Sequence, residues 1–123
     1  MSASPFTEFL AEIIGLLPNS LGAIIQDWEG ETIEYFGHLK ADELRINAAQ
    51  WGLLWRMIKY QAKHPYLKSS REIIIETDRQ KIIIHTLFDR YYLVILLRKS
   101  ASLSEARRVI GDMSARIVKE MGF

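Results

Sequence analysis

Hydrophobic residues recur at helical spacing near both ends of the chain. Ser4 and Pro5 form a typical helix start, because a hydroxyl caps free backbone N–H groups and proline is favoured at the first helical position. Ser102 and Glu105 lie three residues apart, as in a capping box. The spacing predicts helices from residue 5 to about 17 and from 103 to about 121. Their apolar stripes comprise Phe6, Leu10, Ile13, Ile14 and Leu17 in the first helix, and Leu103, Ala106, Val109, Ile110, Met113, Ile117 and Met121 in the last.

Between these helices the chain contains short runs of β-branched and aromatic residues. They predict strands over residues 21–28, 32–36, 72–77, 81–88 and 91–98. Short polar turns connect most of them and favour antiparallel neighbours, and Glu29-Gly30 suits a hairpin turn because glycine tolerates positive φ. The last two runs are apolar almost throughout, which is typical of strands covered on both faces of a sheet.

A third helix is predicted in the middle of the chain, with Asp42 as its N-cap and its end near Lys63, shortly before Pro65. The element order is therefore α-β-β-α-β-β-β-α. We expect one α+β domain over residues 1–123, in which a five-stranded, mostly antiparallel sheet carries helices on both faces.

This central helix is apolar on two opposite sides when its residues are placed about 100° apart. The tryptophan stripe consists of Leu44, Ala48, Trp51, Trp55, Ile58 and Ala62. The second stripe consists of Ile46, Ala49, Leu53, Met57 and Tyr60. The stripes are separated on one side by a basic seam of Arg45, Arg56, Lys59 and Lys63 with Gly52, and on the other by an uncharged seam of Asn47, Gln50, Leu54 and Gln61.

The two stripes predict two surfaces. Each buried tryptophan removes about 200 Å² from water, so we assign that stripe to the protein's own sheet. The second stripe then points outward, as an interface would. We expect a homodimer contact through Gln50, Leu54, Met57 and Gln61. We expect a further protein-binding surface built from Ile46, Leu53, Met57 and Tyr60, with Arg45, Arg56 and Lys59 attracting an acidic partner. The alternative is a helix buried on both sides within one copy. Gly52 either permits a close backbone approach or is merely tolerated.

The strand Glu72-Ile73-Ile74-Ile75-Glu76 raises a similar question. At the edge of a sheet its unpaired backbone groups would be an aggregation hazard. Pairing with a second copy across a two-fold axis would remove that hazard. The expected dimer interface therefore also includes Glu72, Ile73, Ile74, Ile75 and Glu76. The alternative is a central strand within one sheet.

Composition and motifs argue against catalysis. The net charge of +1 would not attract nucleic acid, and the absence of cysteine excludes disulfides and thiolate chemistry and suits a reducing cytoplasm. No signal peptide or bilayer-spanning run is evident, so we expect a cytoplasmic protein that inserts into no membrane. His38, His64 and His85 lack ligand spacing, and no phosphate-binding glycine loop or nucleophile elbow occurs. We predict no catalytic residue, metal or cofactor.

Four segments resemble the roadblock/dynein light-chain family, which has a profilin-like fold. They are Leu21–Asp27 with Glu29-Gly30, Ala41-Asp42-Glu43-Leu44, Ile73–Glu76 with residues 81–88, and Ser102–Arg107. The resemblance implies a homodimer in which the third strand pairs with its twin and the central helices lie side by side. It also implies a small Ras-like GTPase as partner, as in bacterial gliding-motility regulation, and no nucleotide hydrolysis by the chain itself.

Together these features predict a non-enzymatic, dimeric module that regulates or scaffolds a small GTPase or a related signalling or motility partner. One alternative is a small-molecule sensor, since profilin-like folds also host pockets. Trp51, Trp55, Tyr91 and Tyr92 would then line a cavity between helix and sheet. Another alternative is a purely structural adaptor in a larger assembly.

Overall fold

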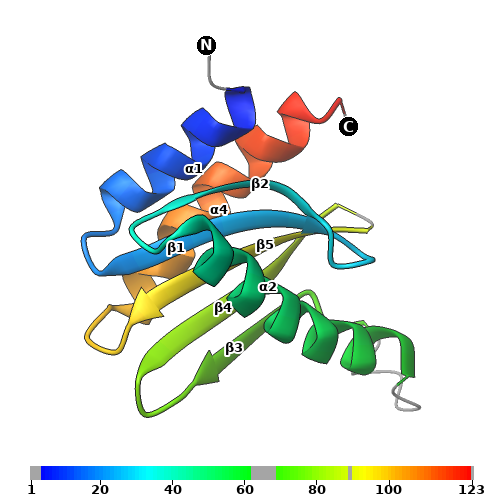
Figure 1. Ribbon diagram of the computed structural model, residues 1–123. Helices are drawn as coiled ribbons and strands as arrows, with labels where there is room; N and C mark the ends of the chain where they lie inside the picture. The colour runs from blue at the N-terminus through cyan, green and yellow to red at the C-terminus, as the bar shows by residue number, and fades with distance from the viewer. Residues whose placement is uncertain (1–3, 62–68, 89, 123) are drawn as a thin grey trace.

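The computed structural model describes residues 4–61, 69–88 and 90–122. Its elements follow the predicted order (Figure 1). They are α1 (Pro5–Leu16), β1 (Ser20–Asp27), β2 (Thr32–Gly37), α2 (Ala41–Arg56), a π-helical turn η1 (Met57–Gln61), β3 (Glu72–Glu76), β4 (Gln80–Phe88), β5 (Tyr91–Arg98) and α4 (Leu103–Glu120). The strands form one sheet in the order β2-β1-β5-β4-β3, and all neighbouring strands are antiparallel.

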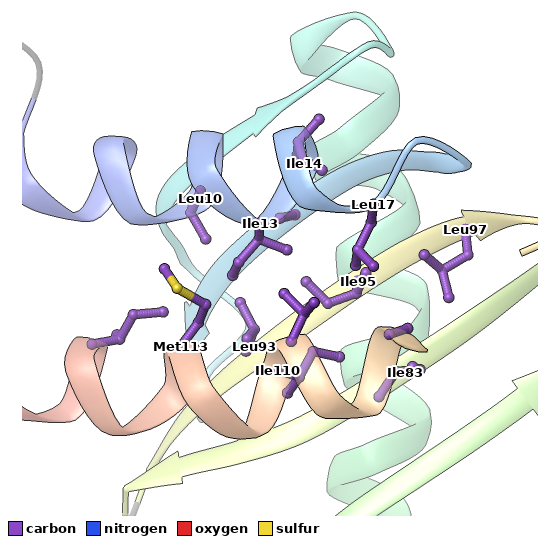
Figure 2. Packing of buried hydrophobic residues seen from close by; sticks show 14 of the residues in the cluster. Leu10, Ile13, Ile14, Leu17, Ile83, Leu93, Ile95, Leu97, Ile110 and Met113 are labelled. Carbon is purple, nitrogen blue, oxygen red and sulfur yellow. The ribbon is translucent and has the colours of Figure 1, made fainter. Parts of the chain in front are cut away.

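Helices cover both faces of this sheet, as predicted. Helices α1 and α4 lie on one face and α2 crosses the other (Figure 1). Leu10 and Ile13 of α1 meet Ile110 of α4 over Leu93 and Ile95 of β5 (Figure 2). A smaller cluster lies under α2. The central strands β1, β4 and β5 thus have apolar neighbours on both sides, which explains why their sequences do not alternate.

Two of the three helix starts agree with their sequence signals. The Ser4 hydroxyl accepts a hydrogen bond from Thr7 N at 3.2 Å, and the Ser102 hydroxyl accepts one from Glu105 N at 3.2 Å. The prediction that Asp42 caps α2 is wrong: the N-cap is Lys40, whose side chain makes no capping bond. Asp42 lies in the first helical turn instead, where its negative charge is favourable next to the helix dipole.

The end of the central helix differs from a plain α-helix. After Arg56 the backbone continues as the π-helical turn η1, which holds one more residue per hydrogen-bonded ring than an α-helix. The predicted helix end near Lys63, and Ala62 of the tryptophan stripe, lie outside the described residues. No described helix is both long enough and apolar enough to cross a lipid bilayer.

Candidate protein-interaction surface

The inner side of α2 is seated in the sheet by close packing. Leu44, Ala48 and Trp55 are buried, and the Trp55 ring meets the Tyr92 ring edge-on at a centroid distance of 5.5 Å. Trp51 is partly buried against the same cluster. The assignment of the tryptophan stripe to the protein's own sheet is therefore confirmed.

A glycine allows α2 to approach β1. A Cβ atom on Gly52 would lie 2.4 Å from Gln26 Oε1, so no larger residue fits unless Gln26 moves. Gln26 is itself buried, and its Nε2 donates a hydrogen bond to the Ala48 carbonyl at 3.0 Å. Of the two interpretations of Gly52, the structure supports the close approach.

The outer side of α2 is exposed, as the second stripe predicted. The exposed fractions are 58% for Ile46, 52% for Leu53, 47% for Met57 and 51% for Tyr60. The alternative of a helix buried on both sides within one copy is therefore wrong. Isolated exposed apolar residues are ordinary on protein surfaces, whereas several on one face of one helix form a patch.

Two arginines of the basic seam contact the β1–β2 hairpin. The Arg45 guanidinium lies 5.0 Å from the centroid of the Tyr35 ring. Arg56 Nη1 donates a hydrogen bond to the Trp28 carbonyl at 3.3 Å. Lys59 Nζ lies 5.7 Å from the centroid of the Trp55 ring. Arg45 and Arg56 thus help to hold helix and hairpin together, whereas the Lys59 contact stays within the helical segment. The sequence pattern did not indicate these contacts.

Aromatic residues join the end of α2 to two turns of the sheet. The Tyr60 and Tyr92 hydroxyls lie 2.9 Å apart, and the Tyr60 ring meets the Trp28 ring edge-on at 6.5 Å. The guanidinium of Arg90, in the β4–β5 turn, lies 5.0 Å from the Trp28 ring centroid. Sequence reasoning placed Trp28 at the end of a strand and missed this cluster. The signal it overlooked was an aromatic residue directly before a Glu-Gly turn.

The uncharged seam faces the other way, toward the β3–β4 hairpin. Asn47 Oδ1 accepts a hydrogen bond from Gln80 Nε2 at 3.5 Å. Gln50 is exposed and Leu54 is partly buried. The side chain of Gln61 lies outside the described part of the structure. The seam assigned to the dimer contact therefore points toward the end of the sheet formed by β3.

Strand β3 is an edge strand, so the alternative of a central strand is wrong. Two hydrogen bonds at the ends of β3 show which of its residues bond to β4. Thr86 N donates to the Arg71 carbonyl at 2.8 Å and Thr77 N donates to the Gln80 carbonyl at 2.9 Å. Odd-numbered residues of β3 thus bond to β4, because hydrogen-bonded pairs recur at every second residue of an antiparallel ladder. The backbone groups of Glu72, Ile74 and Glu76 point away from the sheet.

Side chains of β3 alternate between the two faces. Ile73 and Ile75 pack against the cluster beneath α2. Glu72 lies on the α4 side, where its carboxylate is 3.0 Å from Arg107 Nε and 3.2 Å from His85 Nδ1. On the same side Glu76 Oε1 is 4.0 Å from Lys81 Nζ, so both acidic residues have a basic neighbour. The edge therefore presents isoleucines between paired charges.

The aromatic cavity suggested for a small-molecule sensor is not formed. Tyr91 packs against the cluster of α1 and α4, whereas Tyr92 packs beneath α2. The four aromatic residues cannot line one cavity, because successive side chains of a strand point to opposite faces. A surface hollow of about 370 Å³ lies instead on the α1 and α4 side, between Phe6, Ile33 and Met121. Among residues 4–61, 69–88 and 90–122, no group of three or more His, Asp or Glu side chains is placed to hold a metal.

Comparison with known proteins identifies the fold. No protein-family model and no curated protein matches the sequence. A Roadblock/LC7 domain from Streptomyces avermitilis superposes with a TM-score of 0.86 at 14% identity, covering 98% of this chain and 100% of that domain. The gliding protein MglB from Thermus thermophilus gives 0.80 at 19% identity, with 98% and 95% covered. Acanthamoeba castellanii profilin IB gives 0.63 at 12% identity, with 95% and 98% covered. The chain has the profilin-like α+β fold of Roadblock/LC7 domains, as its sequence predicted.

Proposed function

We propose that this chain is a non-enzymatic, dimeric regulatory or scaffold module that binds a small Ras-like GTPase. The observation that carries the proposal is the outer face of α2 and of the turn η1 that follows it, where four large apolar side chains are each about half exposed. The fold shared with MglB and with Roadblock/LC7 domains supports a regulatory role.

The apolar residues of the outer face fall on one line along α2. Ile46, Leu53 and Met57 are separated by seven and four residues, which are α-helical repeats of one face. Tyr60 follows in the π-helical turn η1 and is half exposed. Leaving this face in water forgoes about 25 cal/mol for every Å² that a partner would cover. A second protein that covers Leu53 at the centre of the line gains that burial.

Self-association is supported by the difference between the two edges of the sheet. Strand β2 carries a register irregularity opposite Ile25 and Gln26, which is a common way to protect an edge. Strand β3 keeps a regular register with β4 from Glu72 to Glu76 and contains neither proline nor lysine. A second copy added to β3 would satisfy its outward backbone groups.

In such a dimer the two surfaces of α2 have separate roles. The uncharged seam with Gln50 and Leu54 faces the β3 edge and therefore the second copy. Met57 and Gln61 are the further residues that the sequence assigns to the dimer contact. Ile46, Leu53 and Tyr60 remain available to the GTPase, and Met57 belongs to both surfaces. Arg45, Arg56 and Lys59 flank this face, so their positive charge would steer an acidic surface toward it.

The proposal is tested with the wild-type chain and a GTP-loaded Ras-like GTPase from the same genome. Leu53→Glu and Met57→Glu should each abolish binding in biolayer interferometry while the circular dichroism spectrum stays unchanged. Leu16→Glu is the matched control, because Leu16 is also exposed but lies at the end of α1 on the other side of the sheet. Light scattering should give the mass of a dimer.

Three outcomes would contradict the proposal. Binding retained by both α2 variants would remove the outer face of α2 from the interface. A monomeric mass at micromolar concentrations would contradict self-association. A dimer that binds no Ras-like GTPase in either nucleotide state would favour the purely structural adaptor.

A further inference from the structure

The surface hollow on the α1 and α4 side of the sheet takes no part in the proposed function. Its volume of about 370 Å³ lies within the range of roughly 300–1,000 Å³ that is typical of small-molecule sites. Helix α2 covers the opposite face of the sheet, so the hollow is separate from the outer face of α2 (Figure 1). The lining residues come from the start of α1, from β2 and β5, and from the end of α4: Phe6, Ile33, Tyr91, Glu120 and Met121.

A β-bulge brings Ile33 to this hollow. Thr32 opposes Gln26, whose side chain bonds to the backbone of α2. Glu34 opposes Ile25, which belongs to the cluster of α1 and α4. Opposed residues share a face, so Thr32 and Glu34 lie on different faces, although a regular strand would place them on the same one. Ile33 is the extra residue between them, and bulges are known to re-aim side chains in this way beside functional sites.

The walls of the hollow are apolar and held in place by the core. Phe6, Tyr91 and Met121 are partly buried against the cluster of α1 and α4. Ile33 is 43% exposed and offers the outermost apolar contact. Two aromatic rings suit a flat apolar group, and their faces also attract a positive charge. The flexible thioether of Met121 adapts to the shape of what it contacts.

The rim of the hollow is acidic. Glu120 is the charged residue of the lining, and among the described residues its carboxylate takes part in no ion pair or hydrogen bond. Helix α4 ends at Glu120, where the negative end of the helix dipole adds to this charge. The Glu34 carboxylate accepts a hydrogen bond from the Ser4 hydroxyl at 3.1 Å, which places a second negative charge beside the start of α1. Lys119, the basic neighbour of Glu120 in sequence, is not part of the lining.

We propose that this hollow binds a small organic cation with an apolar body, of the arylalkylamine class. The aromatic body of the ligand contacts Phe6, Ile33 and Tyr91, and its ammonium group pairs with the Glu120 carboxylate. Burial of the apolar body supplies most of the affinity. The exposed ion pair contributes selectivity, because such pairs are weak. All lining residues belong to one copy of the chain, so the site requires neither the dimer nor the GTPase of the proposed function.

Three probes that share an indole ring but differ in charge test the ligand class: tryptamine, tryptophol and indoleacetate. Each is titrated into the isotope-labelled full chain and followed by heteronuclear NMR. Tryptamine should bind with a millimolar Kd, roughly fivefold more tightly than indoleacetate, with the neutral tryptophol between them. The largest shifts of backbone signals should occur at Ile33, Tyr91 and Glu120. The signals of Leu53 and Met57 on the other face should stay in place.

The role of the carboxylate is tested with Glu120→Gln. This variant should reduce the preference for tryptamine over indoleacetate to about twofold or less and leave tryptophol binding unchanged. Asp112→Asn is the matched control, because it removes one negative charge from an exposed position of the same helix outside the hollow. An equal loss of preference in both variants, or in neither, would overturn the pairing with Glu120.

The apolar part of the site is tested with Ile33→Ala. The lost contact should weaken tryptamine and tryptophol alike, roughly threefold, while the circular dichroism spectrum stays unchanged. Phe36→Ala is the control on the same strand, since Phe36 is similarly exposed at 38% but does not line the hollow. Equal weakening by the two variants would overturn the placement of the ligand.

Three further results would contradict the proposal. The absence of shifts with any probe up to about 5 mM would remove the site. Equal affinity for the three probes would show apolar adsorption without selection for a cation. Shifts at the hollow that follow protein concentration without any probe would show that a second copy of the chain covers it. Leu53→Glu should bind tryptamine as the wild type does, so this site and the surface of the proposed function can fail separately.

Discussion

Helices α4 and α2 cover opposite faces of one sheet, but their outer surfaces differ. On α4 the apolar residues Val109, Ile110 and Met113 are buried, and none of the large apolar residues exposed in the described structure belongs to this helix. On α2 the buried residues are matched by an exposed apolar line that includes Ile46 and Leu53. One stripe is enough to attach a helix to this sheet, and the exposed second stripe of α2 is the surface that the proposed function assigns to a partner.

The two faces of the sheet differ in the same sense. Helices α1 and α4 share one face and seal the larger cluster between them (Figure 2). Helix α2 lies alone on the other face, and its contacts with the β1–β2 hairpin are polar and aromatic at its edges. A helix without a neighbouring helix leaves its flanks accessible, and these flanks are where a second copy or a partner would bind.

The difference between α4 and α2 is tested most strongly by introducing one glutamate into the apolar residues of each helix. Ile110→Glu in α4 buries an unpaired charge among apolar side chains and should lower the free energy of unfolding by at least about 3 kcal/mol. Leu53→Glu in α2 should change it by less than about 0.5 kcal/mol, because Leu53 is half exposed. Urea unfolding followed by circular dichroism measures both. Similar losses in the two variants would mean that the outer face of α2 supports the protomer's own fold.

Substitutions on the two sides of α2 itself should also differ in their effect on the free energy of unfolding. Trp55→Ala removes a fully buried ring that packs on Tyr92 and should cost about 3–5 kcal/mol of unfolding free energy. Ile46→Ala, on the exposed side, should cost less than about 0.5 kcal/mol. Thermal and urea unfolding at several protein concentrations would distinguish these effects from dimer dissociation. A small effect of Trp55→Ala would contradict the assignment of the tryptophan stripe to the sheet.

Glycines in the two helices should respond with opposite signs. Gly111 in α4 is exposed with no neighbouring atom within 4 Å of an added Cβ, so Gly111→Ala should gain about 0.5–1 kcal/mol through helix propensity. Gly52→Ala should instead lose about 1 kcal/mol, since the new methyl group displaces the buried Gln26 from its bond to the Ala48 carbonyl. Equal gains in unfolding free energy would show that Gln26 moves aside without penalty.

The sequence was sufficient for the elements and for the two stripes of α2. Periodicity reports burial directly, so the tryptophan stripe and the exposed line with Leu53 were assigned to the correct sides. The position of β3 was left open because an isoleucine-rich run suits an edge strand and a central strand equally well. Its place at the edge depends on the strand order, which no local pattern encodes.

Contacts between distant segments were the part that the sequence could not supply. Arg56 and Trp28 meet only because α2 crosses the β1–β2 hairpin. The π-helical turn after Arg56 also has no propensity signal comparable to those of helices and strands. Tyr91 and Tyr92 were grouped into one cavity although adjacent strand residues face opposite sides. The N-cap of α2 was misplaced because Asp42 has the chemistry of a cap without its backbone conformation.

Helix α2 also differs from α1 and α4 in lacking a side-chain cap, and this difference should have the smallest effect on stability. Lys40 has the extended backbone of an N-cap, with φ −62° and ψ 152°, close to the values of φ −69° and ψ 158° at Ser4, which caps α1. Lys40→Ser should therefore add about 0.5 kcal/mol of unfolding free energy by capping the first turn, and Ser102→Ala should remove about 1 kcal/mol from α4. Lys99→Ser, an equivalent change in the turn before α4, is the control for the lost charge. If thermal unfolding shows no gain for Lys40→Ser beyond that of Lys99→Ser, the first turn of α2 is already satisfied by water, and capping plays no part in the contrast between the helices.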